Sequence, residues 1–230
     1  MRVHVAFTPA EHAEAPTGVV VDVLRATSTI AEALASGHSR VLCCSAIEEA
    51  EALRAELGDG LLAGERKCVR IPGFDRGNSP AEFTAGGGET VILTTTNGTR
   101  ALVTAAARCE RVLAASLLNL GAVVAAARET GEDVAVFCAG VRGEFAMDDA
   151  YVAGRLVEEL AGDVTDAAEA AVRLRSSFAS AEDGLRASQS ARNLLAAGLE
   201  EDIAWCARES VLEVVPRVEG THGPAVVLRA

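Results

Sequence analysis

The sequence predicts an α/β fold, a three-layer α/β/α sandwich around a mostly parallel, mixed sheet. Two features of the 230-residue chain carry this prediction. Short runs of β-branched and other apolar residues alternate with alanine-rich segments in which apolar residues recur every three or four positions. The short runs lack the polar alternation of strands with one wet face, so helices should bury the strands on both faces. No linker or repeat interrupts the pattern, and we expect one domain, residues 1–230.

The expected strands lie at residues 18–23, 40–44, 61–63, 91–95, 112–115 and 134–138, and the expected helices between them at 28–36, 46–57, 99–107 and 117–129. From residue 146 to about residue 208 the pattern indicates successive helices, broken at Gly162, Gly184 and Gly198. Two last strands are expected at 210–215 and 225–228. Glycine turn signals in the loop 216–224 predict a closing hairpin, and hence an antiparallel component of the sheet.

Composition excludes several classes of protein. The net charge of −12 and the pI of about 4.8 argue against a nucleic-acid partner, because binding to a phosphate backbone relies on clustered cations. No apolar run approaches the length of a membrane span and the first nine residues do not form a signal peptide, so we expect a cytoplasmic protein without a membrane partner. The six scattered cysteines form no Cys-x-x-Cys pair and should be free. Any metal would therefore need oxygen ligands.

The first candidate site follows the strand expected at residues 18–23. Asp22 stands at the end of this strand, where an unpaired buried carboxylate would be costly. Arg25 is close enough to pair with it, and Thr27 or Ser28 could cap the next helix. A structural Asp22–Arg25 bridge is the alternative. We favour a functional role because ligands of open α/β sheets bind beyond the carboxyl ends of strands.

The second candidate segment begins with Glu65 and Arg66 and continues through a loop rich in glycine and proline. Ordering such a loop is entropically costly, which is a poor way merely to join two elements. The loop residues that we expect to contact substrate are Asp75, Asn78 and Ser79. A surface loop that leads into a short helix is the alternative.

The third segment follows the apolar run 91–93 and consists of three threonines, Asn97, Gly98, Thr99 and Arg100. A strand-to-helix turn here would expose backbone N–H groups at a helix N-terminus, which attracts anions. A plain helix cap is the alternative, but it needs only one such residue. We expect substrate contacts from Thr96, Asn97, Gly98, Thr99 and Arg100.

The fourth segment leads from the strand expected at 134–138 to Asp148 and Asp149, at the start of a long helix. Carboxylates in a first helical turn commonly only face the helix dipole, which is the alternative here. Together with Asp22 and Glu65, Asp149 would complete a set of the hard oxygen ligands that Mg²⁺ prefers. Cys138 as a nucleophile is the weaker hypothesis.

Familiar phosphate-handling motifs are absent. A Walker A loop needs Gly-Lys-Ser/Thr, whereas the only lysine, Lys67, follows Arg66. The position six residues after Cys138 is Glu144, where a cysteine phosphatase needs arginine, and Leu24 stands where a haloacid-dehalogenase-type enzyme needs its second aspartate. There is no Gly-x-Ser-x-Gly elbow, and the four histidines form no cluster.

The four segments, in this order and at this spacing, resemble the 2-phosphosulfolactate phosphatase family. The resemblance covers nearly the whole chain and rests on residues 22–30, 64–66 with 73–80, 94–102, and Phe145 with 148–154. Two departures stand out. Lys67 and Cys68 occupy positions where the family often has a glycine pair, which could reshape the pocket, and Asp148 stands where glutamate is usual.

The resemblance implies an α/β/α phosphatase that uses Mg²⁺ to hydrolyse 2-phosphosulfolactate to sulfolactate and phosphate, a step of coenzyme M biosynthesis. It points to Asp22, Glu65 and Asp149 as catalytic residues and metal ligands, and Arg25 and Arg66 join the substrate contacts. The expected partner is a small anionic phosphorylated substrate, and a homodimer is the candidate assembly. Another phosphorylated hydroxy acid as substrate, or a non-catalytic anion-binding domain, remains the alternative.

Overall fold

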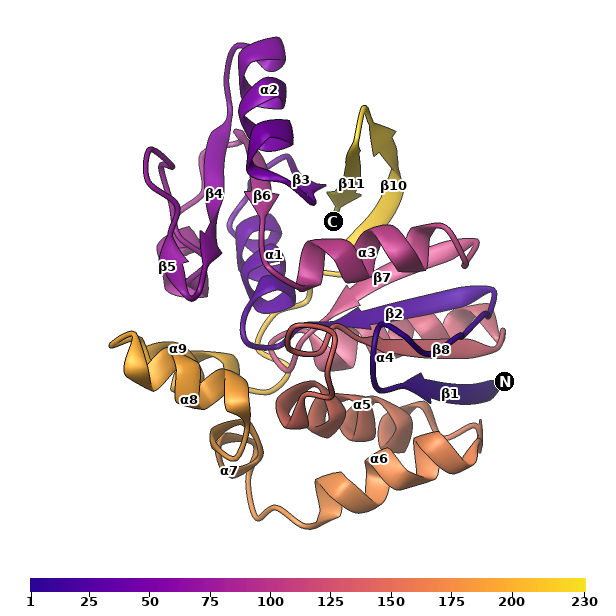
Figure 1. The fold of residues 1–230 in the computed structure, drawn as a ribbon. Helices are drawn as coiled ribbons and strands as arrows, with labels where there is room; N and C mark the ends of the chain where they lie inside the picture. Colours follow the sequence, from indigo (N-terminus) through magenta and orange to yellow (C-terminus); the bar gives the residue numbers. More distant parts are fainter.

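The computed structural model describes residues 1–230. Its centre is one eleven-stranded sheet with the order β5-β4-β6-β3-β11-β10-β7-β2-β8-β1-β9 (Figure 1). In chain order the strands are β1 (Arg2–Ala6), β2 (Thr17–Val21), β3 (Arg40–Cys44), β4 (Leu61–Arg66), β5 (Val69–Arg70), β6 (Thr90–Thr94), β7 (Arg111–Ala115), β8 (Val134–Cys138), β9 (Asp163–Val164), β10 (Arg217–His222) and β11 (Ala225–Arg229).

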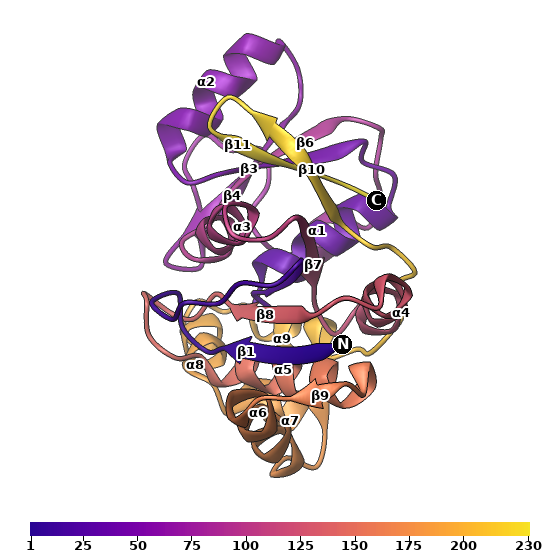
Figure 2. The same cartoon turned by 90° about the vertical axis from the view of Figure 1, so that its right-hand side faces the viewer.

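The sheet consists of two parallel groups joined by an antiparallel hairpin. Strands β4, β6 and β3 form one parallel group, and β7, β2, β8, β1 and β9 form the other. The C-terminal hairpin β10–β11 lies between them, antiparallel to β3 on one side and to β7 on the other (Figure 2). The α/β class and the mostly parallel, mixed sheet are therefore confirmed.

Helices cover both faces of the sheet. They are α1 (Ala26–Ala35), α2 (Ile47–Leu57), α3 (Gly98–Ala106), α4 (Leu120–Thr130), α5 (Met147–Leu160), α6 (Asp166–Ser176), α7 (Ala181–Arg186), α8 (Gln189–Ala196) and α9 (Glu200–Cys206), with a short 3₁₀ helix at Pro80–Phe83. Helices α1 and α3 pack on one face, against residues of both parallel groups. On the other face α2 covers the first group, and α4, α5 and α6 cover the second.

Burial on both faces explains why the strand sequences lack alternation. All five residues of β2, β6 and β8 are buried. Within β2, Val20 joins the apolar cluster under α1 and α3, while Val19 and Val21 join the cluster under α5. None of the helices combines the length and the apolar character needed to cross a bilayer.

The chain ends differ from expectation. The strand expected at 210–215 is wrong, because this segment crosses the molecule without strand pairing and the first hairpin strand is β10, at Arg217–His222. Residues 210 and 212 instead donate backbone hydrogen bonds to the carbonyls of Leu117 and Leu118 in the β7–α4 loop, which fixes the path into the hairpin. Strand β1 was not expected, and it pairs with β8 in the second parallel group.

Candidate active site

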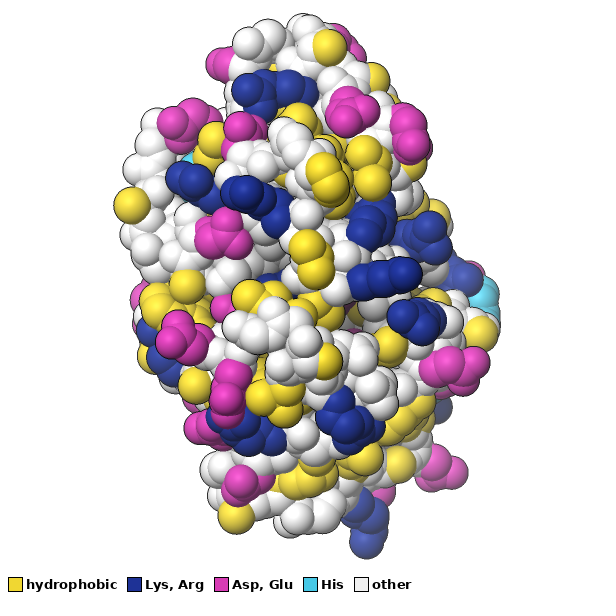
Figure 3. Space-filling view, turned by 60° about the vertical axis from the view of Figure 1, so that its left-hand side comes forward, with side chains coloured by type: hydrophobic (Ala, Val, Ile, Leu, Met, Phe, Trp, Pro, Cys, Tyr) yellow, Lys and Arg dark blue, Asp and Glu magenta, His cyan; other side chains and the backbone are white.

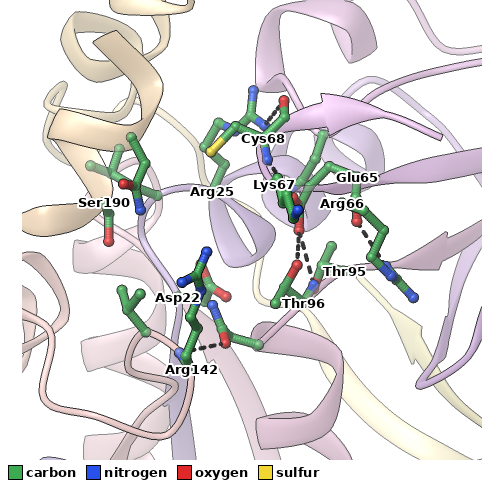
Figure 4. Close-up of a pocket in the computed structure, with 15 residues that line it drawn as sticks. Asp22, Arg25, Glu65, Arg66, Lys67, Cys68, Thr95, Thr96, Arg142 and Ser190 are labelled. Atoms are coloured by element: carbon green, nitrogen blue, oxygen red, sulfur yellow. Dashed lines mark hydrogen bonds between the residues drawn. The ribbon is translucent and has the colours of Figure 1, made fainter. Parts of the chain in front are cut away.

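A cavity of about 490 Å³ opens where the carboxyl ends of β2, β4 and β6 approach each other; we call it the central pocket (Figure 4). Its walls come from the loops after these strands, the turn after β8, and helix α8. Its lining residues are Asp22, Leu24, Arg25, Glu65, Arg66, Lys67, Cys68, Asn78, Thr95, Thr96, Asn97, Val141, Arg142, Ser190 and Asn193. Both parallel groups therefore contribute to one site, as the rule for ligands of α/β sheets predicts.

Asp22 is the first residue after β2 and is buried at the floor of this pocket. Its Oδ1 accepts a hydrogen bond from the Ala26 backbone N–H at the start of α1 (3.2 Å). The pKa of Asp22 is raised to about 7, mainly by burial and also by the charges of Asp148 and Glu65, against the lowering effect of the Ala26 N–H. Close to neutral pH the protonated and the ionised forms of this carboxyl group are therefore both populated.

Gly98, the first residue of α3, lies directly against Asp22. A Cβ at position 98 would come within 2.6 Å of Asp22 Oδ2 and 2.5 Å of the Ala26 side chain. Only glycine lets the α3 N-terminus approach this carboxylate so closely. Gly98 is therefore needed for packing against Asp22, and its expected contact with substrate stays a prediction.

Glu65 lies near the end of β4 and connects two walls of the pocket. Its Oε1 accepts hydrogen bonds from the backbone N–H (2.9 Å) and the hydroxyl (2.8 Å) of Thr96, and its Oε2 accepts one from the Cys68 backbone N–H (2.8 Å). These bonds hold the β6–α3 turn against the β4–β5 hairpin, which Figure 4 shows as dashed lines. Glu65 is only 8% exposed and lines the pocket.

Asn78 lines the same pocket, and its side-chain oxygen is unpaired. The side chain is 4% exposed, and its Oδ1 is buried without a hydrogen-bond partner. A buried amide oxygen left without a partner is costly, and a ligand or cation in the pocket would satisfy it. With the carboxylates of Asp22 and Glu65, it gives the pocket three side chains with hard oxygen donors, which fit Mg²⁺.

Asp149 differs from the other expected metal ligands because it does not line the pocket. Its two carboxylate oxygens accept hydrogen bonds from the backbone N–H groups of Val23 and Gly140, both at 3.0 Å. Burial, together with the charges of Asp148 and Asp22, raises its pKa well above the usual range. Asp149 thus ties the loops after β2 and β8 together, and no three His, Cys, Asp or Glu side chains converge as a ready metal cage.

Asp148 lies next to Asp149 and reaches the pocket through another residue. Its Oδ1 accepts a hydrogen bond from the hydroxyl of Ser190 (3.1 Å), which lines the pocket from α8. Burial raises the pKa of Asp148 to about 6, against the lowering effect of its hydrogen bonds. The acidic pair at the start of α5 therefore positions its neighbours.

The turn between β6 and α3 presents free donors to the pocket. The Thr99 backbone N–H donates to the Thr95 hydroxyl, and the Thr99 hydroxyl donates to the Thr95 carbonyl, both at 3.3 Å. These two bonds close the turn. The backbone N–H groups of Asn97 and Gly98 have no acceptor within the chain. Free N–H groups at a helix N-terminus are donors that favour an oxyanion, and binding of substrate there stays a prediction.

Arg25 is held almost rigidly at the edge of the pocket. Its Nη1 is 2.6 Å from Asp202 Oδ2 on α9, and its Nη2 donates to the Cys68 carbonyl (3.2 Å). The hydroxyl of Ser79 donates to the other Asp202 oxygen (2.6 Å). All three side chains are buried, so Ser79 supports Arg25 through Asp202 and does not itself face the pocket. The alternative of a structural Asp22–Arg25 bridge is not found, because Arg25 pairs with Asp202.

Two arginines that we expected to bind substrate have different environments. Arg66 lines the pocket, and its guanidinium donates to the carbonyl of Glu65 (2.7 Å) and to the carbonyl and hydroxyl of Thr94 (3.4 and 3.1 Å), which ties β4 to β6. Arg100 is exposed on α3 and lies outside the pocket. Asp75 is also outside it, because its carboxylate binds Arg54 (2.8 Å) and the Leu62 backbone N–H (2.9 Å).

Of the expected site residues, the structure brings Asp22, Arg25, Glu65, Arg66, Asn78, Thr96 and Asn97 together in the pocket, and leaves Asp75, Ser79, Gly98, Thr99, Arg100 and Asp149 outside its lining. Sequence reasoning missed Ser190 and Asn193, which come from α8, far along the chain. It also left Lys67, Cys68 and Arg142 unassigned. For the two α8 residues the sequence carries no signal, because only the folded chain places α8 across the pocket from the β4–β5 hairpin (Figure 1).

The charge around the pocket differs from the charge of the whole molecule. Figure 3 brings forward the side on which β5 and α8 face each other, and Lys and Arg side chains gather across the middle of this face. The chain nevertheless has a net charge of −12. Cations concentrated on one face of an acidic protein attract a small anion to that face.

Comparison with known proteins finds relatives over nearly the whole chain. A family model described as 2-phosphosulpholactate phosphatase matches residues 4–221. A probable 2-phosphosulfolactate phosphatase of Thermotoga petrophila is 41% identical over 218 residues, which cover 93% of this chain and 94% of the relative. A protein of the same name from Deinococcus radiodurans is 39% identical over 237 aligned positions, covering 100% and 98% of the two chains. One from Clostridium acetobutylicum is 35% identical over 209 residues, covering 87% and 88%.

Proposed function

The chain belongs to the 2-phosphosulfolactate phosphatase family, whose members are phosphoric monoester hydrolases, and we propose that it hydrolyses 2-phosphosulfolactate to sulfolactate and phosphate with the help of Mg²⁺. Membership of a phosphatase family removes the alternative of a non-catalytic anion-binding domain. The reaction would be the coenzyme M type of step that the sequence resemblance implies.

One observation carries the proposal: Asp22, Glu65 and Asn78, whose buried oxygen is unpaired, line a pocket whose other walls carry cations and lie beside free N–H groups. Mg²⁺ is typically held by one or two carboxylates together with water and substrate phosphate, so a complete protein cage is not required. We assign Asp22, Glu65 and Asn78 as the residues that would hold the ion. The chemistry that a bound Mg²⁺ supplies is neutralisation of charge on the phosphoryl oxygens.

The other residues of the pocket position the phosphoryl group. The free N–H groups of Asn97 and Gly98 donate to its oxygens at the α3 N-terminus, which costs no reorganisation when charge develops there. Glu65 holds Thr96 in place, and Arg66 fixes the end of β6, which leads to these donors. Asp149 fixes the loops after β2 and β8, on the Asp22 side of the pocket. Hydrolysis breaks the bond between phosphorus and the ester oxygen, adds a water oxygen to phosphorus, and leaves a proton for the sulfolactate hydroxyl.

The test is phosphate release from 2-phosphosulfolactate by the purified protein. We expect turnover with Mg²⁺ and no turnover after exhaustive treatment with EDTA. Mn²⁺ should restore part of the activity, because both ions accept octahedral oxygen sites. Asp22→Asn should abolish turnover and weaken Mg²⁺ binding measured by calorimetry while the circular dichroism stays that of the folded protein. Asp59→Asn, at an exposed aspartate between α2 and β4, is the matched control. Full activity without metal, or of Asp22→Asn with it, would refute the proposal.

A further inference from the structure

Four cationic side chains line the central pocket, and two of them have no partner in the protein. Arg25 is committed to Asp202, and Arg66 is committed to Glu65 and Thr94. The side chains of Lys67 and Arg142 are exposed at the pocket and make neither a hydrogen bond nor an ion pair (Figure 4). In a chain with 33 acidic residues, a lysine and an arginine without an acidic partner are free to bind a ligand.

Lys67 stands in a turn that does not favour its side chain. Strands β4 and β5 pair at Arg66 and Val69, so Lys67 and Cys68 form a two-residue turn. Both have left-handed backbone conformations, with φ values of 55° and 67°. Turns of this shape favour glycine or asparagine because a Cβ is strained there. The backbone contacts of this turn, from the Cys68 N–H to Glu65 and from Arg25 to the Cys68 carbonyl, would be equally available to glycine.

Arg142 stands in a second turn of the same kind. The backbones of Val141 and Glu144 exchange two hydrogen bonds of 3.0 Å, and the two residues between them also have positive φ, 55° at Arg142 and 86° at Gly143. The second of these positions is glycine, whereas the first holds an arginine. The Arg142 backbone N–H donates to Asn97 Oδ1 (3.1 Å), which anchors the turn beside the free N–H groups of the α3 N-terminus.

The same arrangement therefore occurs twice on different walls of one pocket: a tight turn holds an unpartnered cation at a position where a side chain is strained. Nothing within the protein compensates either residue. An anionic ligand group within reach of both side chains would pair their charges. The phosphoryl group already has the α3 donors and the oxygen ligands around Asp22, so a different acid group of the ligand is the partner of these cations.

We propose that Lys67 and Arg142 are specificity-determining residues that bind the acid groups of the substrate other than its phosphoryl group. They select phosphate esters whose carbon chain also carries a carboxylate or a sulfonate over esters with an uncharged chain. This inference rests on the proposed function for the site and names the feature of the substrate that the site recognises. Lys67 and Arg142 thus determine which substrate binds, whereas Asp22 and its neighbours carry out the chemical step.

The test compares two substrates in variants that keep the turns intact. Lys67→Asn and Arg142→Asn remove the charges, and asparagine accepts the left-handed conformation. For 2-phosphosulfolactate each variant should lower kcat/KM about tenfold to a hundredfold, the range for loss of a charge-assisted contact. For isopropyl phosphate, which has the same branched ester but no second acid, kcat/KM should not change. Arg70→Asn, which removes a cation of the same hairpin that does not line the pocket, should affect neither substrate.

A binding measurement separates this inference from the proposed function. Sulfolactate, the product without a phosphoryl group, should bind the wild-type protein, and the double variant should bind it about tenfold or more weakly in calorimetry. If the wild-type protein binds sulfolactate through these cations but does not hydrolyse 2-phosphosulfolactate, the proposed function fails and the inference stands. The inference is overturned and the function stands if turnover is found but the variants lower kcat/KM equally for both substrates. The same holds if turnover is found and the double variant binds sulfolactate as tightly as the wild type.

Discussion

The carboxyl group of Asp22 lies where a strand ends, a helix begins and the central pocket opens. It bonds to the α1 N-terminus through Ala26, and Gly98 presses the start of α3 against it. Burial near other carboxylates makes its ionised form unfavourable in the metal-free protein, and the Mg²⁺ that we propose would favour that form. Three features of the pocket are unfavourable without a ligand: the raised pKa of Asp22, the Asn78 oxygen without a hydrogen-bond partner, and the cations without an acidic partner.

The first prediction concerns Asp22 and the pH dependence of stability without metal. The pKa of Asp22 is about 7 in the folded state against 3.8 in the unfolded chain, so between these values the unfolded chain is ionised and the folded protein is protonated. Unfolding then releases a proton, and the free energy of unfolding falls as pH rises from about 4 to about 7. Asp148, with a pKa of about 6, adds to the same trend.

Asp22→Asn should therefore unfold much like the wild type at pH 4 and be the more stable protein at pH 8, with EDTA present in both cases. Urea titrations at the two pH values measure this. A stability loss of about 3 kcal/mol or more in Asp22→Asn at pH 8 would instead indicate that a charged Asp22 is part of a buried bridge.

The second prediction separates the two arginines that the sequence placed together. Arg66→Ala should lower kcat/KM about tenfold to a hundredfold, because the guanidinium ties the ends of β4 and β6, which carry Glu65 and Thr96. Arg66→Lys should restore only part of the rate, since an ammonium cannot span the Thr94 carbonyl and hydroxyl as the fork does. Arg100→Ala should have wild-type kinetics, because Arg100 is exposed outside the pocket. A lower kcat/KM in Arg100→Ala would contradict this and would show that Arg100 contacts the substrate.

At the scale of elements, the site depends on helices that the strands do not position. Helix α9 carries Asp202, which binds Arg25 and Ser79 at once, and α8 carries Ser190 and Asn193 into the pocket. These helices follow the second parallel group in sequence but contact loops of the first. They therefore close the pocket on the side opposite β5, as Figures 1 and 4 show.

The third prediction tests the buried Arg25–Asp202 pair. Asp202→Ala leaves the guanidinium of Arg25, whose side chain is 3% exposed, without its carboxylate, and should lower the free energy of unfolding by roughly 3–5 kcal/mol. Urea unfolding gives the value. Glu169→Gln, at the exposed pair with Arg173, is the matched control and should leave stability unchanged. Equal stability of Asp202→Ala and the wild type would show that Arg25 finds another partner.

The elements also show how far sequence reasoning reaches. Six strands between residues 18 and 138 and the helices between them were predictable because each strand is a short apolar run, as in β2 and β8, which are buried on both faces. The two-residue strand β5, whose residues are exposed, was expected to be loop. Asp22, Glu65 and Thr96 could be found because they stand where such runs end. The strand at 210–215 was misplaced because Val211, Val214 and Val215 look like a strand but lie in a connecting segment. Asp202 and Ser190 could not be found, because their partners are more than 40 residues away in sequence.

At the scale of the whole molecule, the central pocket exists only if the two parallel groups stay together. Asp22 comes from one group, and Glu65 and Thr96 come from the other. The C-terminal hairpin completes the sheet between the groups, but β10 pairs with β7 at a single register position. The continuous apolar cluster under α1 and α3, which includes residues from both groups and from β11, provides the second connection.

The last prediction follows from this arrangement. Leu228 of β11 is fully buried in that shared cluster, so Leu228→Ala should lower the free energy of unfolding by about 2–5 kcal/mol, whereas Arg229→Ala, at the exposed pair with Glu219, should change it little. Because α1 and α3 pack on both groups, the groups should unfold together. Loss of activity and loss of circular dichroism should then occur at the same, lowered temperature in Leu228→Ala. Activity that disappears while the dichroism is still that of the folded protein would mean that the hairpin alone, and not the shared core, keeps Asp22 and Glu65 on one pocket.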